Sequence, residues 1–270
     1  MIPVGFEYER PHSVEGALTL LAERGEDAKI LAGGHSLLPV MKLRLAAPEV
    51  VIDIGKIAEL RYIRVDGDEV AIGAGARHHD LESSSDIGAQ VPLLGAVART
   101  VGDPQVRHRG TIGGSLAHAD PASDLPAAVL ALGGTVVLRS PRGERQVPIT
   151  SFYTGVFSTV LEPDELIVEI RVPRTGTAGW AYEKFTRRAN DWAIVGVAAV
   201  DGRVGLVNMG QTPLRASATE AALADGASIA DAAALADQDT DPPADMAATK
   251  AYRKHLAKIL TKRALTTAAG

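Results

Sequence analysis

The chain reads Leu31-Ala32-Gly33-Gly34-His35-Ser36-Leu37 between the short apolar step Lys29 to Leu31 and a predicted helix. Paired glycines let the backbone take positive φ angles and approach a ligand closely. Successive N–H groups at the start of a helix can then cradle a pyrophosphate, and the Ser36 hydroxyl adds a donor. An ordinary tight turn is the other interpretation of this segment taken alone.

A second glycine segment reads Arg109-Gly110-Thr111-Ile112-Gly113-Gly114-Ser115 and is followed by the carboxylates of Asp120 and Asp124. Hydroxyls beside a glycine pair suit the phosphates of a nucleotide, and a carboxylate accepts from a ribose hydroxyl. Taken alone, this segment is also compatible with a glycine loop before a capped helix that starts near Pro126. Two such loops in different parts of the chain favour a ligand held between them. No G-x-G-x-x-G follows a first predicted strand, which disfavours a Rossmann site for a nicotinamide cofactor.

Apolar periodicity and turn residues divide the chain into three predicted domains. The first, residues 1–55, is a small α/β unit with a helix over Val14 to Arg24, capped by Ser13, and a buried strand over Val50 to Ile54. The second, residues 56–177, is also α/β and has hairpins that turn at Asp66-Gly67 and near Pro141. The third, residues 178–270, has an antiparallel ribbon; from Leu214 onward strand signals end and the composition becomes alanine-rich.

Composition narrows the kind of function. The chain has 270 residues, with 33 acidic and 28 basic residues and a net charge of −5, so nucleic acid is a poor candidate partner. It contains no cysteine, which excludes disulfides, iron–sulfur ligation by thiolates and cysteine-linked flavin, so redox chemistry has to come from a bound cofactor. The first residues lack a secretory leader pattern, and no apolar run approaches the roughly 18 residues that span a bilayer. We therefore expect a cytoplasmic protein with no membrane span.

An ordered set of motifs is similar to one family over essentially the whole chain. The set resembles the FAD-binding medium subunits of molybdenum hydroxylases, nearest to the carbon monoxide dehydrogenase type and related to the FAD domain of xanthine dehydrogenases. Four segments carry most of the resemblance: Ala32 to Pro39, Asp103 to Arg107, Gly110 to Gly114 and Asp120 to Asp124. It continues through Met1-Ile2-Pro3, Phe6-Glu7-Tyr8, Arg10-Pro11, Asp164-Glu165-Leu166, Tyr182-Glu183-Lys184, Asp191-Trp192-Ala193 and Tyr252-Arg253-Lys254-His255.

The resemblance implies an α+β fold of the vanillyl-alcohol-oxidase-like (PCMH) type. In this fold two α/β domains clasp FAD, and a C-terminal domain with a three-stranded antiparallel sheet and helices follows. The resemblance also implies a small partner subunit with two [2Fe-2S] clusters and a large partner subunit with the molybdenum cofactor, assembled as a dimer of heterotrimers. Electrons would run from molybdenum through the clusters to the flavin of this chain and on to an external acceptor.

The resemblance also implies which residues bind FAD. In the first glycine loop, the pyrophosphate and neighbouring flavin atoms would be held by Ala32, Gly33, Gly34, His35 and Ser36. Lys29, Ile30 and Leu31 would line the approach, and Leu37 is also predicted to bind the cofactor. The second loop would surround other parts of FAD through Val101, Gly110, Thr111, Ile112, Gly113, Gly114, Ser115, His118, Asp120 and Asp124. Ser115 stands where the family commonly has asparagine. Leu166, Lys184 and Trp192 match positions near the isoalloxazine, and Trp192 stands where tyrosine or an aliphatic residue can occur. We expect no catalytic acid or base and no metal ligand in this chain.

Three other features have alternative interpretations. The loop around His35 also resembles the one that carries a histidyl-linked flavin in berberine-bridge-type oxidases, so covalent attachment stays open beside noncovalent binding. His78, His79 and Asp80 resemble metal ligands, but adjacent side chains point apart, and we expect a solvated helix start. The basic residues of the last predicted helix are expected to form a solvated face, with docking to a partner subunit as the alternative. These residues are Lys250, Arg253, Lys254, Lys258, Lys262 and Arg263.

The leading function is electron transfer by noncovalent FAD within a multisubunit molybdenum hydroxylase. One rival is a self-sufficient flavin oxidase or reductase of the same fold, resembling the cell-wall enolpyruvyl reductases, which would need its own catalytic proton donor. A second rival is a nucleotide-binding assembly module without enzymatic activity. The substrate stays open among carbon monoxide, N-heterocycles, purines and aldehydes, because the family selects it on the large subunit. The physiological acceptor stays open too.

Overall fold

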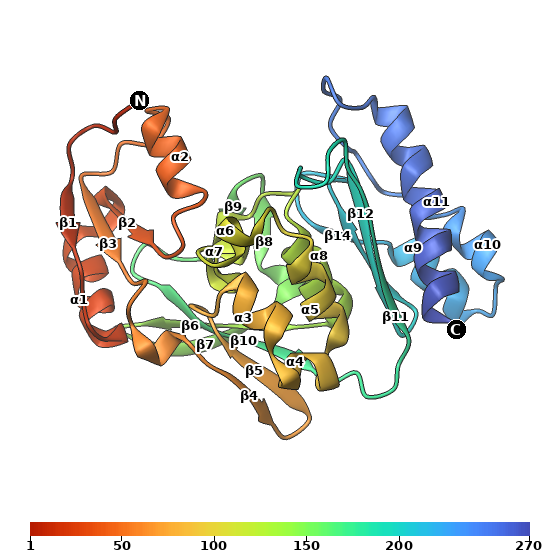
Figure 1. Ribbon diagram of the computed structural model, residues 1–270, viewed down its shortest axis with the longest axis horizontal. Helices are drawn as coiled ribbons and strands as arrows, with labels where there is room; N and C mark the ends of the chain where they lie inside the picture. Colours follow the sequence, from red (N-terminus) through yellow and green to blue (C-terminus); the bar gives the residue numbers. More distant parts are fainter.

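The computed structural model describes residues 1–270 as three main sheets with their helices, which follow one another from left to right in Figure 1. The first sheet is parallel, has the order β1-β3-β2 and is formed by Glu7–Glu9, Ala28–Leu31 and Val50–Asp53. The helices here are α1 (Val14–Arg24) and α2 (Leu37–Lys42), with a 3₁₀ turn at Gly25–Asp27. The Ser13 hydroxyl accepts the N–H of Gly16 at 3.1 Å, so the predicted cap and the bounds of α1 are confirmed.

The second sheet is a five-stranded antiparallel sheet in the order β4-β5-β10-β6-β7. Its strands are Ile63–Asp66, Glu69–Gly73, Leu166–Pro173, Thr135–Ser140 and Gly143–Pro148. Helices α3 (His78–Ser83), α4 (Ser85–Gln90), α5 (Pro92–Arg99), α6 (Pro104–Arg107), α7 (Ile112–His118) and α8 (Asp124–Leu132) lie together above this sheet in Figure 1. Short 3₁₀ turns at Ala58–Leu60 and Ile149–Ser151 and the ribbon of β8 (Tyr153–Gly155) and β9 (Ser158–Thr159) complete this part.

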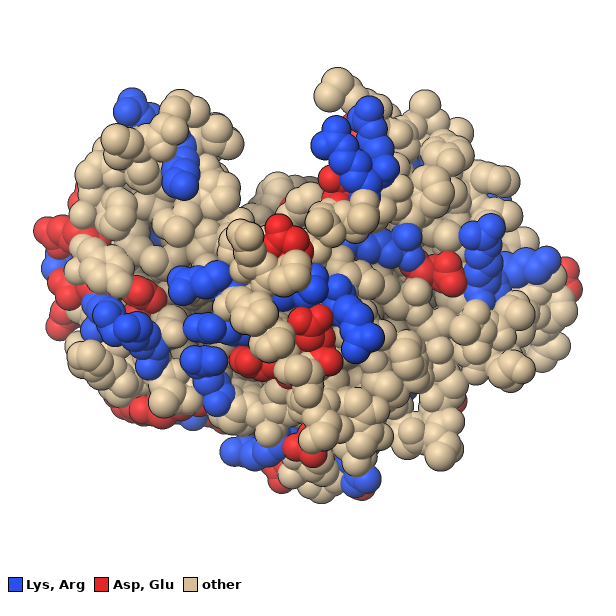
Figure 2. All heavy atoms as spheres, in the orientation of Figure 1, with Lys and Arg blue, Asp and Glu red and all other residues tan.

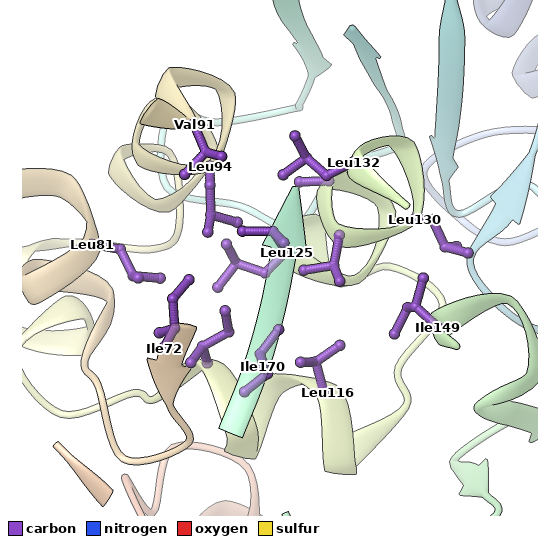
Figure 3. Packing of buried hydrophobic residues seen from close by; sticks show 14 of the residues in the cluster. Ile72, Leu81, Val91, Leu94, Leu116, Leu125, Leu130, Leu132, Ile149 and Ile170 are labelled. Atoms are coloured by element: carbon purple, nitrogen blue, oxygen red, sulfur yellow. The ribbon is translucent and has the colours of Figure 1, made fainter. Parts of the chain in front are cut away.

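The helices and the sheet of the middle part enclose the largest hydrophobic core. Figure 3 shows Ile72 of β5 and Ile170 of β10 pointing toward Leu94 of α5, Leu116 of α7 and Leu125 of α8. All five side chains are fully buried. This packing fixes α7 and α8 on the sheet, and with them the second glycine segment.

The third sheet is antiparallel in the order β11-β12-β13-β14, formed by Trp180–Phe185, Val195–Val200, Arg203–Val207 and Leu214–Arg215. The predicted three-stranded sheet therefore has a fourth strand, and the prediction that strands end before Leu214 is wrong. Strand β14 has only two residues, paired with Gly205 and Leu206, which is too short for an alternating pattern. Helices α9 (Ser217–Ala224), α10 (Ile229–Ala233) and α11 (Lys250–Ala268) follow the sheet. None of the helices combines the length and the apolar character that crossing a bilayer requires.

Helix α8 belongs to two layers at once. All of its residues are buried, because it contacts α5 on the side of the middle core and both β12 and β13 of the third sheet. The Arg203 guanidinium of β13 also donates to the carbonyl of Leu132 at the end of α8, at 3.1 Å. The middle and C-terminal parts are thus packed against the same helix.

Candidate cofactor site

A hollow separates the two upper parts of the molecule in Figure 2. Comparison with Figure 1 places the N-terminal sheet with α2 on one side of it and the C-terminal sheet with α11 on the other. The segment between β2 and α2 lies next to the segment between α6 and α7. The two glycine loops identified in the sequence therefore lie on the same side of the molecule.

The first loop, residues 32–36, offers unused backbone donors. None of its N–H groups donates to an acceptor in the protein. Gly34 has φ +80, and the N–H of Leu38 donates to its carbonyl at 3.1 Å, which starts α2. Unpaired N–H groups that precede a helix form a binding surface for an anion, because donors without a protein acceptor can bind its oxygens and the helix dipole favours negative charge.

The two glycine loops are in direct contact. A Cβ on Gly33 would lie 2.3 Å from the carbonyl oxygen of Arg109, so no other residue fits there without moving one loop. Position 114 lies beside Ala32, whose Cβ is 3.9 Å from where a Gly114 Cβ would be. Gly33 is thus required by the protein's own packing. From the sequence, the glycine pair had been explained by the close approach of a ligand instead.

The second loop contributes hydroxyls rather than N–H groups. Thr111 caps α7 by accepting the N–H of Gly114 at 3.1 Å, and the N–H of Gly113 donates to Ala74 at 2.9 Å. The first donors of this helix are therefore already paired within the protein. The Thr111 hydroxyl proton remains free to donate, and the Ser115 and Ser123 hydroxyls lie 2.9 Å apart. Hydroxyl groups of this kind suit phosphate oxygens or ribose hydroxyls.

The end of α7 brings a histidine and an aromatic ring together. His118 packs against Phe157, with ring centroids 5.1 Å apart, and burial lowers the pKa of His118. Asp120 is 4.0 Å from His118 and accepts the N–H of Ala122 at 2.9 Å. Phe157 has φ +54 and is 58% exposed, so one part of its ring contacts His118 while the rest is open to solvent beside the second loop. Phe157 was not identified from the sequence. The only sequence signal for it is an aromatic residue in a turn shortly after Gly155.

Asp124 and Lys184 form a buried ion pair between the middle and C-terminal parts. The Lys184 ammonium donates to Asp124 at 2.7 Å and to the carbonyl of Thr100 at 3.0 Å, and the Tyr182 hydroxyl donates to the same carboxylate. Burial raises the pKa of Asp124, and its two partners lower it. The structure thus brings two predicted site residues together, next to Val101, but it pairs them with each other.

Replacing Lys184 with methionine is expected to lower the free energy of unfolding by about 3–5 kcal/mol, because it leaves a buried carboxylate without its counter-charge. The folded protein holds the Asp124 proton more tightly than the unfolded chain, since burial raises its pKa. Protonation therefore relieves the defect, and the gap to the wild type should narrow as pH falls from about 8 to about 5. Denaturant unfolding at both pH values measures this, with exposed Lys29→Met as the control. A gap that does not change with pH would contradict the role of Asp124.

The remaining predicted residues lie in different surroundings. Trp192 is 57% exposed in the turn between β11 and β12, Lys29 and His35 are exposed, and Leu166 is buried in the core against which Ala32 packs. The prediction of a solvated helix start is wrong for His78, which is 5% exposed because it packs under Gly110. Burial, with nearby His35 and Arg107, lowers the pKa of His78 to about 4, so it is neutral at pH 7. No three His, Asp or Glu side chains gather closely enough to hold a metal ion.

The last helix corrects a second prediction about solvated residues. Arg253 of α11 is 1% exposed, because it occupies the buried stripe that continues through Leu256, Ala257 and Leu260. The other members of the basic series are not buried. Charge alone did not distinguish Arg253 from its neighbours; its spacing of three and four residues from apolar positions is the signal that identifies it.

The arrangement fits a dinucleotide with a negatively charged centre. Free N–H groups at residues 32–36 match pyrophosphate oxygens, and the Thr111 and Ser115 hydroxyls of the adjoining loop match further polar groups. Aromatic side chains at Phe157 and Trp192 are exposed on the middle and C-terminal parts.

Comparisons with known proteins agree with this arrangement. Residues 4–175 match the family described as the FAD binding domain in molybdopterin dehydrogenase, and residues 180–268 match the CO dehydrogenase flavoprotein C-terminal domain. The chain is 45% identical over 283 residues to the carbon monoxide dehydrogenase medium chain of Hydrogenophaga pseudoflava, covering 99% of this chain and 98% of the relative.

Solved structures give the same result. A carbon monoxide dehydrogenase structure from Hydrogenophaga pseudoflava has a TM-score of 0.96 at 47% identity, covering 100% of this chain and 99% of its counterpart. Quinoline 2-oxidoreductase from Pseudomonas putida 86 has a TM-score of 0.93 at 32% identity, covering 100% and 98%. The predicted fold class is confirmed by these neighbours. The chain is therefore an oxidoreductase subunit, and it belongs to the family of FAD-binding medium subunits of carbon monoxide dehydrogenase-like molybdenum hydroxylases.

Proposed function

We propose that this chain binds one FAD noncovalently between its two glycine loops and passes electrons from a partner's iron–sulfur clusters to an external acceptor. The observation that carries the proposal is the contact between the loops: the free N–H groups of residues 32–36 lie next to the hydroxyl-bearing start of α7. A dinucleotide needs both kinds of donor along its length.

In this proposal each element has a separate task. Residues 32–36 hold the pyrophosphate, while Thr111 and Ser115 bind neighbouring polar groups. The Asp124–Lys184 pair fixes β11 against α8 and the end of α5, and so sets the position of the turn that bears Trp192. Lys29 to Leu31, Leu37, Val101, His118, Asp120 and Leu166 stay predicted contacts. Bound FAD supplies the redox chemistry, so no side chain of this chain has to act as a catalytic acid or base.

The proposal extends to the assembly. We infer a small subunit with [2Fe-2S] clusters and a large subunit with the molybdenum cofactor, in a dimer of heterotrimers in the cytoplasm. A chain without cysteine supplies no thiolate for such clusters, so another chain must hold them.

The substrate of the assembled enzyme is proposed to be selected outside this chain. The two relatives described above belong to enzymes named for carbon monoxide and for quinoline, although both match this chain over almost its whole length. Molecules so different in size and polarity require different pockets, while the shared chain keeps one fold.

Acid precipitation is expected to release all of the flavin into a yellow supernatant, because the contacts of the FAD site proposed here are noncovalent. The measurement is the absorbance of supernatant and pellet after precipitation of the purified protein. Flavin that stays in the pellet, and moves to the supernatant in a His35→Ala variant, would instead establish a histidyl linkage. Full release of the flavin from both the wild type and the His35→Ala variant is the result that the noncovalent proposal requires.

A further inference from the structure

Arg253 occupies an unfavourable place for a charge. It lies in the first turns of α11 with 1% of its surface exposed, and it is among the largest fully buried side chains in the protein. A cation near a helix N-terminus opposes the helix dipole, and a guanidinium removed from water loses its hydration. An apolar residue of similar size would avoid both penalties, so the contacts of this arginine explain its presence.

Those contacts hold the base of one particular turn. Arg253 donates to the carbonyl of Ile194 and, at 2.6 Å, to Asp245, whose carboxylate also accepts the N–H groups of Ala247 and Ala248. The N–H of Ile194 donates to the carbonyl of Phe185 at 2.8 Å. Phe185 and Ile194 thus close the turn of residues 186–193, and this turn carries Trp192.

The same turn is held from a second side. The Asn208 side chain donates to the carbonyl of Ala193 at 2.9 Å, and the Asn208 backbone N–H donates to Pro121 at 2.8 Å. Ala193 and Ile194, the two residues that follow Trp192, therefore have both carbonyls fixed by side chains from other elements. Of the two, only Arg253 brings a buried charge, which is costly to leave unpaired if the turn moves away.

We propose that Arg253 is a positioning residue for Trp192: by binding the Ile194 carbonyl with a buried guanidinium, it holds the indole ring against the FAD. This inference rests on the FAD site proposed above. The planar fork of arginine allows one nitrogen to bind Ile194 while the other binds Asp245, which the single ammonium of lysine cannot reproduce. Met is the apolar replacement that removes both contacts at similar length.

The test uses the two tryptophans of the chain, Trp180 and Trp192. A Trp180→Phe background leaves Trp192 as the only indole, and Arg253→Met, Arg253→Lys and Leu260→Ala are then compared in it. Leu260 is the matched control, because it is 3% exposed on the same helix but makes none of these contacts. The readouts are FAD content, indole emission with and without FAD, and acrylamide quenching of the indole in FAD-free protein.

Arg253→Met should keep FAD but show a severalfold gain in indole emission in the FAD-bound protein. In FAD-free protein the rise in acrylamide quenching should be smaller, less than about twofold, because Trp192 is already 57% exposed. Arg253→Lys should give a smaller change of the same sign and decides the question if the methionine variant does not fold. Leu260→Ala should lose thermal stability without either change. Unchanged quenching in both arginine variants, or an equal change in Leu260→Ala, would overturn the inference. A background protein without FAD would refute the proposed function instead, while acrylamide access still reports whether Arg253 fixes the turn.

Discussion

Replacing Gly34 with valine is expected to abolish FAD binding in a protein that otherwise folds. Gly34 has φ +80, where a side chain costs about 1–3 kcal/mol of backbone strain, and its Cβ would lie 2.9 Å from Leu38. The chain can relieve this strain only by turning the peptide groups of residues 32–36, which carry the proposed pyrophosphate donors. Each lost hydrogen bond to a charged phosphate weakens binding by roughly 1.5–3 kcal/mol. Since about 1.4 kcal/mol is a tenfold loss of affinity, the loss of several such donors should leave the purified protein with little FAD.

Gly226→Val is the matched control for this variant. Gly226 has φ +83 and no atom within 4 Å of a Cβ, so valine there imposes similar strain in an exposed turn after α9. Purified protein of each variant is compared by flavin absorbance per chain and by thermal unfolding. Wild-type FAD content in folded Gly34→Val would remove the pyrophosphate assignment from this loop. Equal FAD loss in both variants would assign the loss to general destabilisation.

Local signals in the sequence were sufficient to predict several helix ends and hairpin turns. Ser13 defines the start of α1 within its own segment, and Asp66-Gly67 defines a hairpin, because caps and tight turns depend on neighbouring residues. The two glycine loops were likewise visible as motifs. A ligand held between the two loops was inferred from the presence of both motifs. Their direct contact could not be inferred, since it joins Gly33 to Arg109 across distant parts of the chain.

Features that depend on the partner of a charge could not be predicted in this way. Asp124 was expected to accept from a ribose hydroxyl, yet its carboxylate is bound by Tyr182 and Lys184, and Arg253 was expected in solvent. For Asp124 only the packing of distant elements decides whether water or protein surrounds the charge. For Arg253 the helical spacing carried a signal of burial, but the charge was given more weight than the spacing. The domain limits at residues 55 and 177 also stay a proposal. Hydrophobic clusters cross both limits, with Leu166 joining the first core and Ala198 the middle one.

The isolated chain is expected to oxidise no carbon monoxide, purine, aldehyde or N-heterocycle at a detectable rate. It has no cysteine for iron–sulfur ligation, so in the proposed assembly electrons reach its flavin only through the clusters of a partner subunit. Its flavin should still be reduced by dithionite and reoxidised by oxygen or a quinone-like acceptor. Addition of the small and large subunits should restore reduction by the substrate of the complex.

Anaerobic bleaching of the flavin near about 450 nm measures each of these steps. Dithionite reduction of the same sample is the control that the cofactor is present and reactive. Bleaching by one of these substrates with no partner subunit present would favour the self-sufficient oxidase or reductase of the same fold. A purified protein that is colourless and does not take up added FAD would favour the assembly module.

Helix α8, buried by the middle core on one side and by the C-terminal sheet on the other, has a consequence for how the chain folds. A fragment that ends near residue 175, where the first family match stops, would leave the apolar side of α8 next to Ala127 open to water. Contiguous exposed apolar surface of this kind promotes aggregation. The middle and C-terminal parts should therefore unfold in one cooperative transition. A chimera that takes its C-terminal sheet from a relative would have to take α8 from the same relative.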